Sequence, residues 1–194
     1  MNTKIKTTLS ILLVAFSFSL FAQKTDKKVK SFTVERVIKS SAKSVWAVVG
    51  EDFGGIANSH PKIVSSEYNQ GYITGGENAS RTCNFNEKGT KYVQEKQVSY
   101  DAENFTFKVE MYHAAGIPLD PKYNHAVYSV IPIDENSCKL VMEMGVRTKP
   151  AFMTGIAAGK FKKVIADYLL AVEHHVLTGE NVNKENFKEI KKKY

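Results

Sequence analysis

Residues 150–177, PAFMTGIAAGKFKKVIADYLLAVEHHVL, decide the fold of this chain. Mostly apolar side chains recur every three or four positions along this stretch, at Met153, Ala157, Phe161, Val164, Tyr168, Val172 and His175. That spacing predicts one long amphipathic helix with lysines on its other side. Pro150 suits the first turn of a helix, and Gly179 suits a left-handed end just beyond it. Such a helix is about 40 Å long at 1.5 Å per residue, so it can cross a small sheet.

The sequence before this helix consists of short segments in which apolar and polar residues alternate. We predict strands over residues 31–39, 63–68, 79–86, 90–100, 105–112, 123–133 and 137–149. Consecutive strands joined by short turns pair in antiparallel order. Between the first two strands the period changes to a helical one around Val45 and Trp46, after Ser40 or Ser41, either of which can cap a helix.

This order of elements predicts an α+β fold. We expect a seven-stranded curved antiparallel sheet wrapped round a long C-terminal helix, with two short helices between the first and second strands. A helix laid across the concave face buries its apolar stripe and the inner residues of most strands. The sheet does not have to close completely around a single helix. The space left near the short helices is therefore expected to form a concave, mostly apolar pocket.

Two segments between the first two strands carry a family resemblance. Residues 41–46, SAKSVW, and residues 53–61, FGGIANSHP, together with the element order, resemble the START-like helix-grip superfamily (SRPBCC) in its polyketide cyclase/dehydrase and lipid-transport branch. Residues 175–180, HVLTGE, are similar to the helix exit of these proteins, although Ser59 stands where a tryptophan is common. The resemblance covers residues 31–180, which we take as the domain. It implies the helix-grip fold and a pocket for a small molecule.

Three segments are expected to lie outside this domain. Residues 1–22 carry two lysines, an apolar run and the small residue Ala22, which is the order of a secretory signal. The apolar run is shorter than the about 20 residues that a membrane span needs. We therefore expect cleavage near Ala22 and an exported protein, periplasmic or secreted. Residues 23–30 are predicted to be a flexible N-terminal segment, and residues 181–194 a charged C-terminal tail.

Charge and cysteine content exclude several classes of protein. The formal net charge is +7, but many lysines lie in the two terminal segments, where we expect solvated tails and at most weak contact with an anionic membrane surface. The strands lack the aromatic and basic pattern of an RNA-binding protein, so nucleic acid is not an expected partner. Cys83 and Cys138 are predicted to be free and buried. The sequence has no CxxC and no HExxH motif, so we expect no metal and no cofactor; it leaves the oligomeric state open.

Eleven side chains are predicted to contact a ligand between the sheet and the long helix: Trp46, Phe53, His60, Arg81, Phe85, Ile117, Leu119, Met142, Met144, Phe161 and Tyr168. Alternation places Cys138, Leu140, Met142, Met144 and Val146 on one inward face. For the strand over residues 123–133, the set Tyr123, His125, Val127, Ser129 and Ile131 competes with the set Asn124, Ala126, Tyr128 and Val130, and the pattern decides for neither.

Several of these residues have two interpretations. Trp46 either lines the pocket or belongs to the core. His60 is suited to proton transfer at neutral pH, or it fixes its loop through a backbone hydrogen bond. Arg81 shares a face with Cys83 and Phe85, so it needs a partner, either a ligand anion or a salt bridge. The loop over residues 114–122 is either a gate to the pocket or a cover for the sheet edge.

Two functions are compatible with these patterns. The favoured one is an exported binding or carrier protein for a hydrophobic small molecule such as a lipid, an isoprenoid or an aromatic metabolite. The alternative is a cyclase or dehydratase acting on a polyketide-like or aromatic substrate in the same pocket. That alternative requires His60, Arg81 and Glu95 to converge there as catalytic groups. The sequence contains no nucleophile–base motif and no glycine-rich phosphate loop, so we expect binding rather than catalysis.

Overall fold

Seven strands form one antiparallel sheet in the computed structural model, which describes residues 29–194. Their bounds are β1 Lys30–Ile38, β2 Ser65–Tyr68, β3 Ser80–Asn84, β4 Tyr92–Asp101, β5 Thr106–Ala115, β6 His125–Asp134 and β7 Ser137–Val146. The spatial order is β1-β7-β6-β5-β4-β3-β2, so the first strand pairs with the last one and the others follow in reverse. The predicted fold class is confirmed, and the predicted secretory signal lies outside the described residues.

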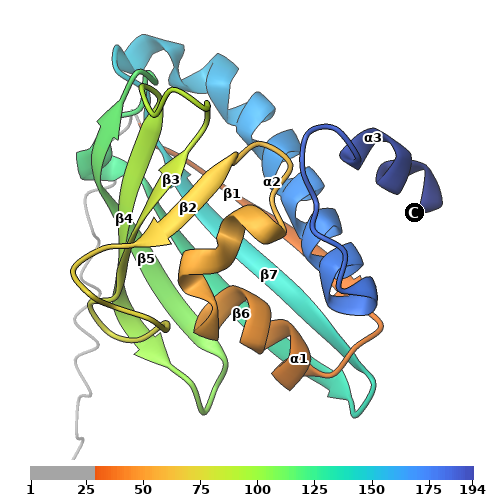
Figure 1. Ribbon diagram of the computed structural model, residues 1–194. Helices are drawn as coiled ribbons and strands as arrows, with labels where there is room; N and C mark the ends of the chain where they lie inside the picture. Colours follow the sequence, from red (N-terminus) through yellow and green to blue (C-terminus); the bar gives the residue numbers. More distant parts are fainter. Residues whose placement is uncertain (1–28) are drawn as a thin grey trace, which may run out of the picture.

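The helices gather on one face of this sheet (Figure 1). Between β1 and β2 the chain forms α1 (Ala42–Trp46), a π-helical continuation η1 (Ala47–Glu51) and the 3₁₀ helix η2 (Phe53–Asn58). Short 3₁₀ turns η3 (Pro121–Tyr123) and η4 (Ala151–Met153) precede β6 and α2 (Thr154–Thr178). After α2 come α3 (Phe187–Ile190) and η5 (Lys191–Lys193).

Local chemistry explains where these elements begin and end. The Ser41 hydroxyl accepts a hydrogen bond from the Ser44 amide at 3.1 Å, so Ser41 caps α1. Gly179 ends α2 with a φ of 71°, a left-handed conformation that glycine adopts without strain. Phe105 also has a positive φ, 50°, and therefore belongs to the turn before β5 rather than to the strand predicted to begin there. Tyr123 lies in η3, so β6 begins at His125, later than predicted.

The inward faces of β6 and β7 supply much of the core. Cys138, Leu140, Met142 and Val146 of β7 are buried, as the alternation predicts. On β6 the buried set is Ala126, Tyr128 and Val130, which decides between the two sets that the sequence left open. Both cysteines are buried and free. No helix of the described residues is long and apolar enough to span a membrane.

The two halves of α2 differ in packing. The C-terminal half is inserted between β1 and the short helices, and the run from Tyr168 to His174 is buried. The N-terminal half is mostly exposed, although Thr154 at its start and Ile165 at its end are buried, and Phe161 and Val164 turn toward the sheet with partial burial. Figure 1 shows α2 running diagonally across the sheet, with its N-terminal end far from α1. The helix therefore covers the sheet closely at one end only.

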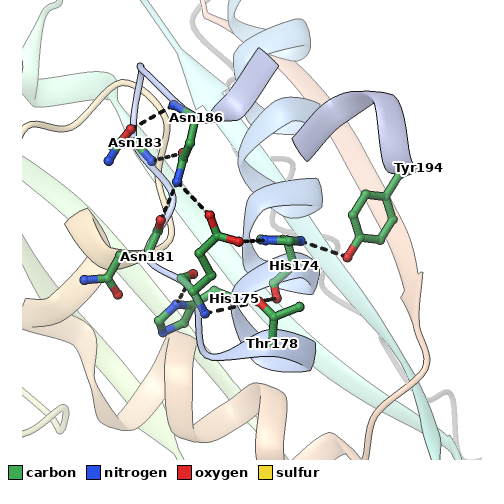
Figure 2. Close-up of polar contacts among 8 residues, drawn as sticks. His174, His175, Thr178, Asn181, Asn183, Asn186 and Tyr194 are labelled. Carbon is green, nitrogen blue, oxygen red and sulfur yellow. Dashed lines mark hydrogen bonds and ion pairs between the residues drawn. The ribbon is translucent and has the colours of Figure 1, made fainter. Parts of the chain in front are cut away.

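The C-terminal segment 181–194, expected to be a charged tail, is folded against α2. Val182 and Ile190 are fully buried with Leu170 and Ala171 in a second apolar cluster, separate from the main core. The buried His174 ring bonds the Glu180 carboxylate at 2.9 Å and the Tyr194 hydroxyl at 3.1 Å, as Figure 2 shows. Phe187 packs against the same cluster, so three apolar side chains hold this highly charged segment on α2.

The same segment also supports the loop that follows η2. The Val182 amide donates to the Asn58 carbonyl at 2.8 Å, and Val182 forms a parallel bridge with Ser59. Asn186 ties the turn between α2 and α3 by donating to Glu180 and to the Asn181 carbonyl (Figure 2). Because Ser59 precedes His60, the contacts of Val182 fix the backbone from which the His60 side chain projects.

An Ile190→Ala variant tests this packing. Removal of a buried isoleucine side chain leaves a cavity, so we expect the free energy of unfolding to fall by about 2–3 kcal/mol. The matched control is Leu177→Ala, since Leu177 is 45% exposed at the end of α2, and its loss should change stability by less than about 0.5 kcal/mol. Urea denaturation followed by circular dichroism measures both, and equal small losses would show that the segment is not part of the core.

Candidate functional site

A cavity of about 120 Å³ lies between the sheet and the N-terminal half of α2. Strands β3 to β7 form its floor, Phe161, Val164, Ile165 and Tyr168 of α2 form its roof, and Leu119 contributes from the loop before η3. Most of the wall is apolar, with Val109, Met111, Ala126, Met142, Met144 and Val146 from the three strands under α2. The cavity arises where the exposed half of α2 diverges from the sheet, so the packing difference within α2 is its cause.

Arg81 and Glu95 form a buried ion pair in the cavity wall. They are direct cross-strand partners on β3 and β4, and the Arg81 side chain is almost completely buried. Its Nε and Nη2 donate to one Glu95 oxygen at 3.0 and 2.7 Å, and its Nη1 donates to the Phe53 carbonyl at 2.7 Å. The guanidinium also stacks 3.9 Å from the centre of the Phe53 ring. Of the two partners that the sequence allowed for Arg81, the structure contains the salt bridge.

His60 lies in the wall beside Tyr168, with the two rings 4.8 Å apart. Its Nδ1 accepts a hydrogen bond from the Lys62 amide at 3.0 Å, which fixes the loop as one of the two interpretations predicted. Burial, assisted by repulsion from Arg81, lowers the pKa of His60 to about 3. The ring is therefore neutral, and because Nδ1 accepts, its proton resides on Nε2. His60 can donate a hydrogen bond there, but it cannot act as a general acid near neutral pH.

Two tyrosines complete this polar end. The Tyr128 ring stacks on Phe107 at 4.4 Å and meets the Tyr168 ring edge-on at 6.4 Å. Burial raises the pKa of Tyr168 to about 12 and that of Tyr128 well above its usual value. Burial likewise raises the pKa of the nearby Cys83 thiol to about 12, so it is no nucleophile. Only Arg81 and Glu95 carry charge at this end, and they cancel.

The structure brings together eight of the eleven predicted ligand contacts: His60, Arg81, Phe85, Leu119, Met142, Met144, Phe161 and Tyr168. Glu95 joins them, so the three candidate catalytic groups do converge. Trp46, Phe53 and Ile117 lie outside the cavity wall. Trp46 packs among Tyr100, Phe105 and Phe107 at 5.2–5.8 Å, which is the core interpretation. Phe53 lies behind Arg81, and Ile117 packs on the core while Leu119 turns inward.

Sequence reasoning missed several wall residues. Tyr128 was missed because the face of β6 was undecided, whereas Val109 and Met111 alternate with polar residues along β5, and this apolar face was a signal that could have found them. The loop over residues 114–122 is bonded to the end of β7 through Asp120 to Arg147 and Lys149 to Pro118, both at 3.0 Å. It therefore packs against the chain at the end of β7, an interior strand, rather than along an edge strand, and it supplies Leu119 to the cavity. Among residues 29–194, no three His, Cys, Asp or Glu side chains gather as a metal site requires.

The ion pair makes a prediction about stability. Glu95→Ala leaves the Arg81 charge buried without its partner, so we expect a loss of about 3 kcal/mol in the free energy of unfolding. The double variant Arg81→Met with Glu95→Leu removes both charges and should lose less than Glu95→Ala alone. Urea denaturation of the wild type, Glu95→Ala and the double variant gives the comparison, and a double variant that loses as much stability as Glu95→Ala or more would contradict the pairing.

The neutral state of His60 makes a prediction about pH. In the unfolded chain His60 has its usual pKa near 6.5, and in the folded protein the pKa is about 3. Between these values the unfolded chain binds a proton that the folded protein does not, so stability falls as pH drops from about 6.5 toward 3. The slope from this group is about 1.4 kcal/mol per pH unit.

Urea denaturation at pH 7, 6, 5 and 4 for the wild type and for His60→Gln isolates this contribution. The glutamine cannot bind the proton, so the variant's stability should fall less steeply over this range. Parallel curves for the two proteins would show that His60 is protonated as easily in the folded protein as in the unfolded chain.

Comparisons with known proteins agree with this architecture. A protein from Thermus thermophilus has a TM-score of 0.62 at 14% identity, over 77% of this chain and 99% of its own. The Zhui aromatase/cyclase from a Streptomyces species has a TM-score of 0.59 at 14% identity, over 76% and 93%. Norcoclaurine synthase from Thalictrum flavum, in complex with dopamine and hydroxybenzaldehyde, has a TM-score of 0.54 at 19% identity, over 77% and 87%.

These identities are low, so the three structures establish the fold alone. No curated protein matches the sequence significantly. The family model described as polyketide cyclase / dehydrase and lipid transport, however, matches residues 30–176, which is most of the chain and includes every residue of the cavity wall. The chain therefore belongs to the polyketide cyclase/dehydrase and lipid-transport family of SRPBCC proteins.

Proposed function

We propose that this protein binds a small, uncharged, hydrophobic molecule that carries one hydrogen-bonding group, and that it acts as a carrier rather than an enzyme. The observation that supports this most strongly is the cavity itself, which has an apolar wall and one polar end without net charge. The family and fold are consistent with a hydrophobic ligand. Residues 1–22 have the order of a secretory signal, so the proposed place of binding is outside the cytoplasm.

The size of the cavity limits the ligand. A volume of about 120 Å³ is comparable to the engineered apolar cavity of about 150 Å³ that binds benzene. The ligand that fits without rearrangement is therefore a single ring or a short branched chain. Norcoclaurine synthase, with the same fold, is seen with dopamine and hydroxybenzaldehyde, which are single-ring molecules. A longer ligand requires the N-terminal half of α2 to move away from the sheet.

The electrostatics of the polar end limit the ligand further. Glu95 already balances the charge of Arg81, so a ligand carboxylate would add an unbalanced negative charge in a buried site. A neutral hydroxyl or carbonyl group avoids this cost. It can accept from the Nε2–H group of His60 or interact with the Tyr168 hydroxyl, both in the wall. A phenol or an aromatic ketone meets all these requirements.

A second candidate, a cyclase or dehydratase, is favoured by one observation. His60, Arg81 and Glu95 converge on the same cavity, where Nε2–H of His60 can polarise a carbonyl group and the Glu95 carboxylate can accept a proton. The two functions differ in their dependence on that carboxylate. In an enzyme, Glu95→Gln abolishes turnover and leaves binding intact, whereas a carrier releases its ligand chemically unchanged from both proteins.

Isothermal titration calorimetry at pH 7 with 4-methylphenol and 4-methylbenzoate tests the proposal. The two molecules have similar size but differ in charge, and we expect the phenol to bind at least about tenfold more tightly. Ala126→Leu fills the cavity and should abolish binding. The matched control is Val130→Leu on the same inward face of β6 but outside the wall, which should bind as the wild type does. Tighter binding of the benzoate, or binding unaffected by Ala126→Leu, would overturn the proposal.

A further inference from the structure

Three large apolar side chains are exposed together where α2 begins. Phe152 and Met153 on η4 and Ile156 on the first turn of α2 are 84%, 41% and 73% exposed. Single exposed apolar residues are common on protein surfaces, but three within five positions form a continuous patch. A Cβ added at Gly155 or Gly159 would touch nothing, so the backbone here also faces open space.

Positive charge surrounds this patch. Between Glu143 and Asp167 the sequence has five basic residues, Arg147, Lys149, Lys160, Lys162 and Lys163, and no acidic one. Within residues 29–194, none of the four lysines is paired with an acidic side chain. Positions 152, 156, 160 and 163 are three or four apart, so the apolar tip and two lysines lie along one exposed face of the helix.

We propose that this face, defined by Phe152, Met153, Ile156, Lys160 and Lys163, docks on the surface of an anionic lipid membrane. Apolar side chains at a helix end enter the boundary between headgroups and acyl chains, and unpaired lysines are attracted to lipid phosphates. Ile156 and Lys160 are within two turns of Phe161 and Val164, which line the cavity from the other side of the helix. Docking therefore places the roof of the cavity against the bilayer.

A lipid surface fits this patch better than a folded protein partner does. Protein interfaces depend on buried tyrosine, tryptophan and arginine side chains that fill pockets, and about 800 Å² per partner. The patch has three apolar side chains on a protruding helix end, flanked by long lysines. The cavity described above lies on the opposite side of α2 from these side chains.

The basic C-terminal segment is less suited to this role. Its large apolar side chains Val182 and Ile190 are buried, and its charges include Glu185 and Glu189. Lys191 and Lys192 are already paired with Asp167 and Glu189. Weak membrane contact was expected from the basic tails, and the exposed tip of α2 is the surface that combines free charge with apolar groups.

Co-sedimentation of the purified protein with ligand-free vesicles tests the docking. We expect binding to vesicles of phosphatidylcholine with phosphatidylglycerol, weaker binding at high salt, and little binding to phosphatidylcholine alone. Phe152→Ser with Ile156→Ser should abolish the binding. The matched apolar control is Val37→Ser with Ile131→Ser, since these residues are 56% and 46% exposed on strands away from the patch.

Charge reversal separates the two basic regions. Lys160→Glu with Lys163→Glu should lower the vesicle partition coefficient by at least about tenfold. Lys184→Glu with Lys188→Glu in the C-terminal segment has the same change in net charge and should change binding much less. All substituted side chains are exposed, so thermal unfolding is expected to match that of the wild type.

Three outcomes would overturn the proposal. One is absence of binding to anionic vesicles, and another is binding lost through the C-terminal variants but kept by the patch variants. The third is a dimer of the wild type that the Phe152 and Ile156 substitutions dissociate, because the patch would then join two copies of this chain.

The docking gives the proposed carrier function access to membrane ligands. The vesicles contain no ligand, so the vesicle experiment does not depend on the proposed ligand binding. If the calorimetry shows no ligand binding, the vesicle result still tests the docking. If the vesicles show no docking, the calorimetry still tests the ligand binding.

Discussion

One helix has to cover a sheet that is much wider than itself, and most features of this protein depend on that mismatch. Seven strands at about 4.8 Å spacing make a surface about 29 Å across, whereas a helix with its side chains is about 10 Å in diameter. The C-terminal half of α2 packs on β1 and β7, and α1 and η2 cover the middle and the far edge at one end. Within residues 29–194 no further element fills the other end, where the sheet and α2 diverge around the cavity.

The chemistry of the cavity follows from how little water reaches it. Burial keeps His60, Tyr128, Tyr168 and Cys83 in their neutral forms, each by moving its pKa away from the range in which it would ionise. The guanidinium of Arg81 cannot become neutral in this way, so it requires a partner, and the cross-strand register supplies Glu95. The wall therefore offers hydrogen bonds without net charge, which is the property on which the proposed preference for uncharged molecules rests.

The fold could be predicted because its signals are local. The seven strands, the short helices and the long helix each have their own periodicity, and the predicted bounds differ from the observed ones by a few residues. The wall was harder to predict, because it depends on register and loop geometry. The pairing of Arg81 with Glu95 needs the register of β3 against β4, and the absence of Trp46 from the wall needs the turn at Phe105, which completes the aromatic cluster around the indole.

The undecided face of β6 and the interpretation of the C-terminal segment have a common physical origin. Tyr128 was missed because both faces of β6 carry mixed polar and apolar residues, so alternation alone has no preference. The C-terminal segment was interpreted as a solvated tail because its composition is charged, although Val182, Phe187 and Ile190 find an apolar surface on α2. In both cases the deciding partner is distant in the sequence. Patterns within a segment do not contain that information.

Through the parallel bridge between Ser59 and Val182, the segment 181–194 supports the backbone of the cavity wall beside His60. Cleavage at the exposed residues 179–181 would detach the Tyr194 hydroxyl bonded to His174, the buried Ile190 and the strand-like contact beside His60 in one step. Residues 30–176, which the family model matches, would stay intact. Such a cut would therefore weaken the support of the candidate site without removing any residue of the cavity wall.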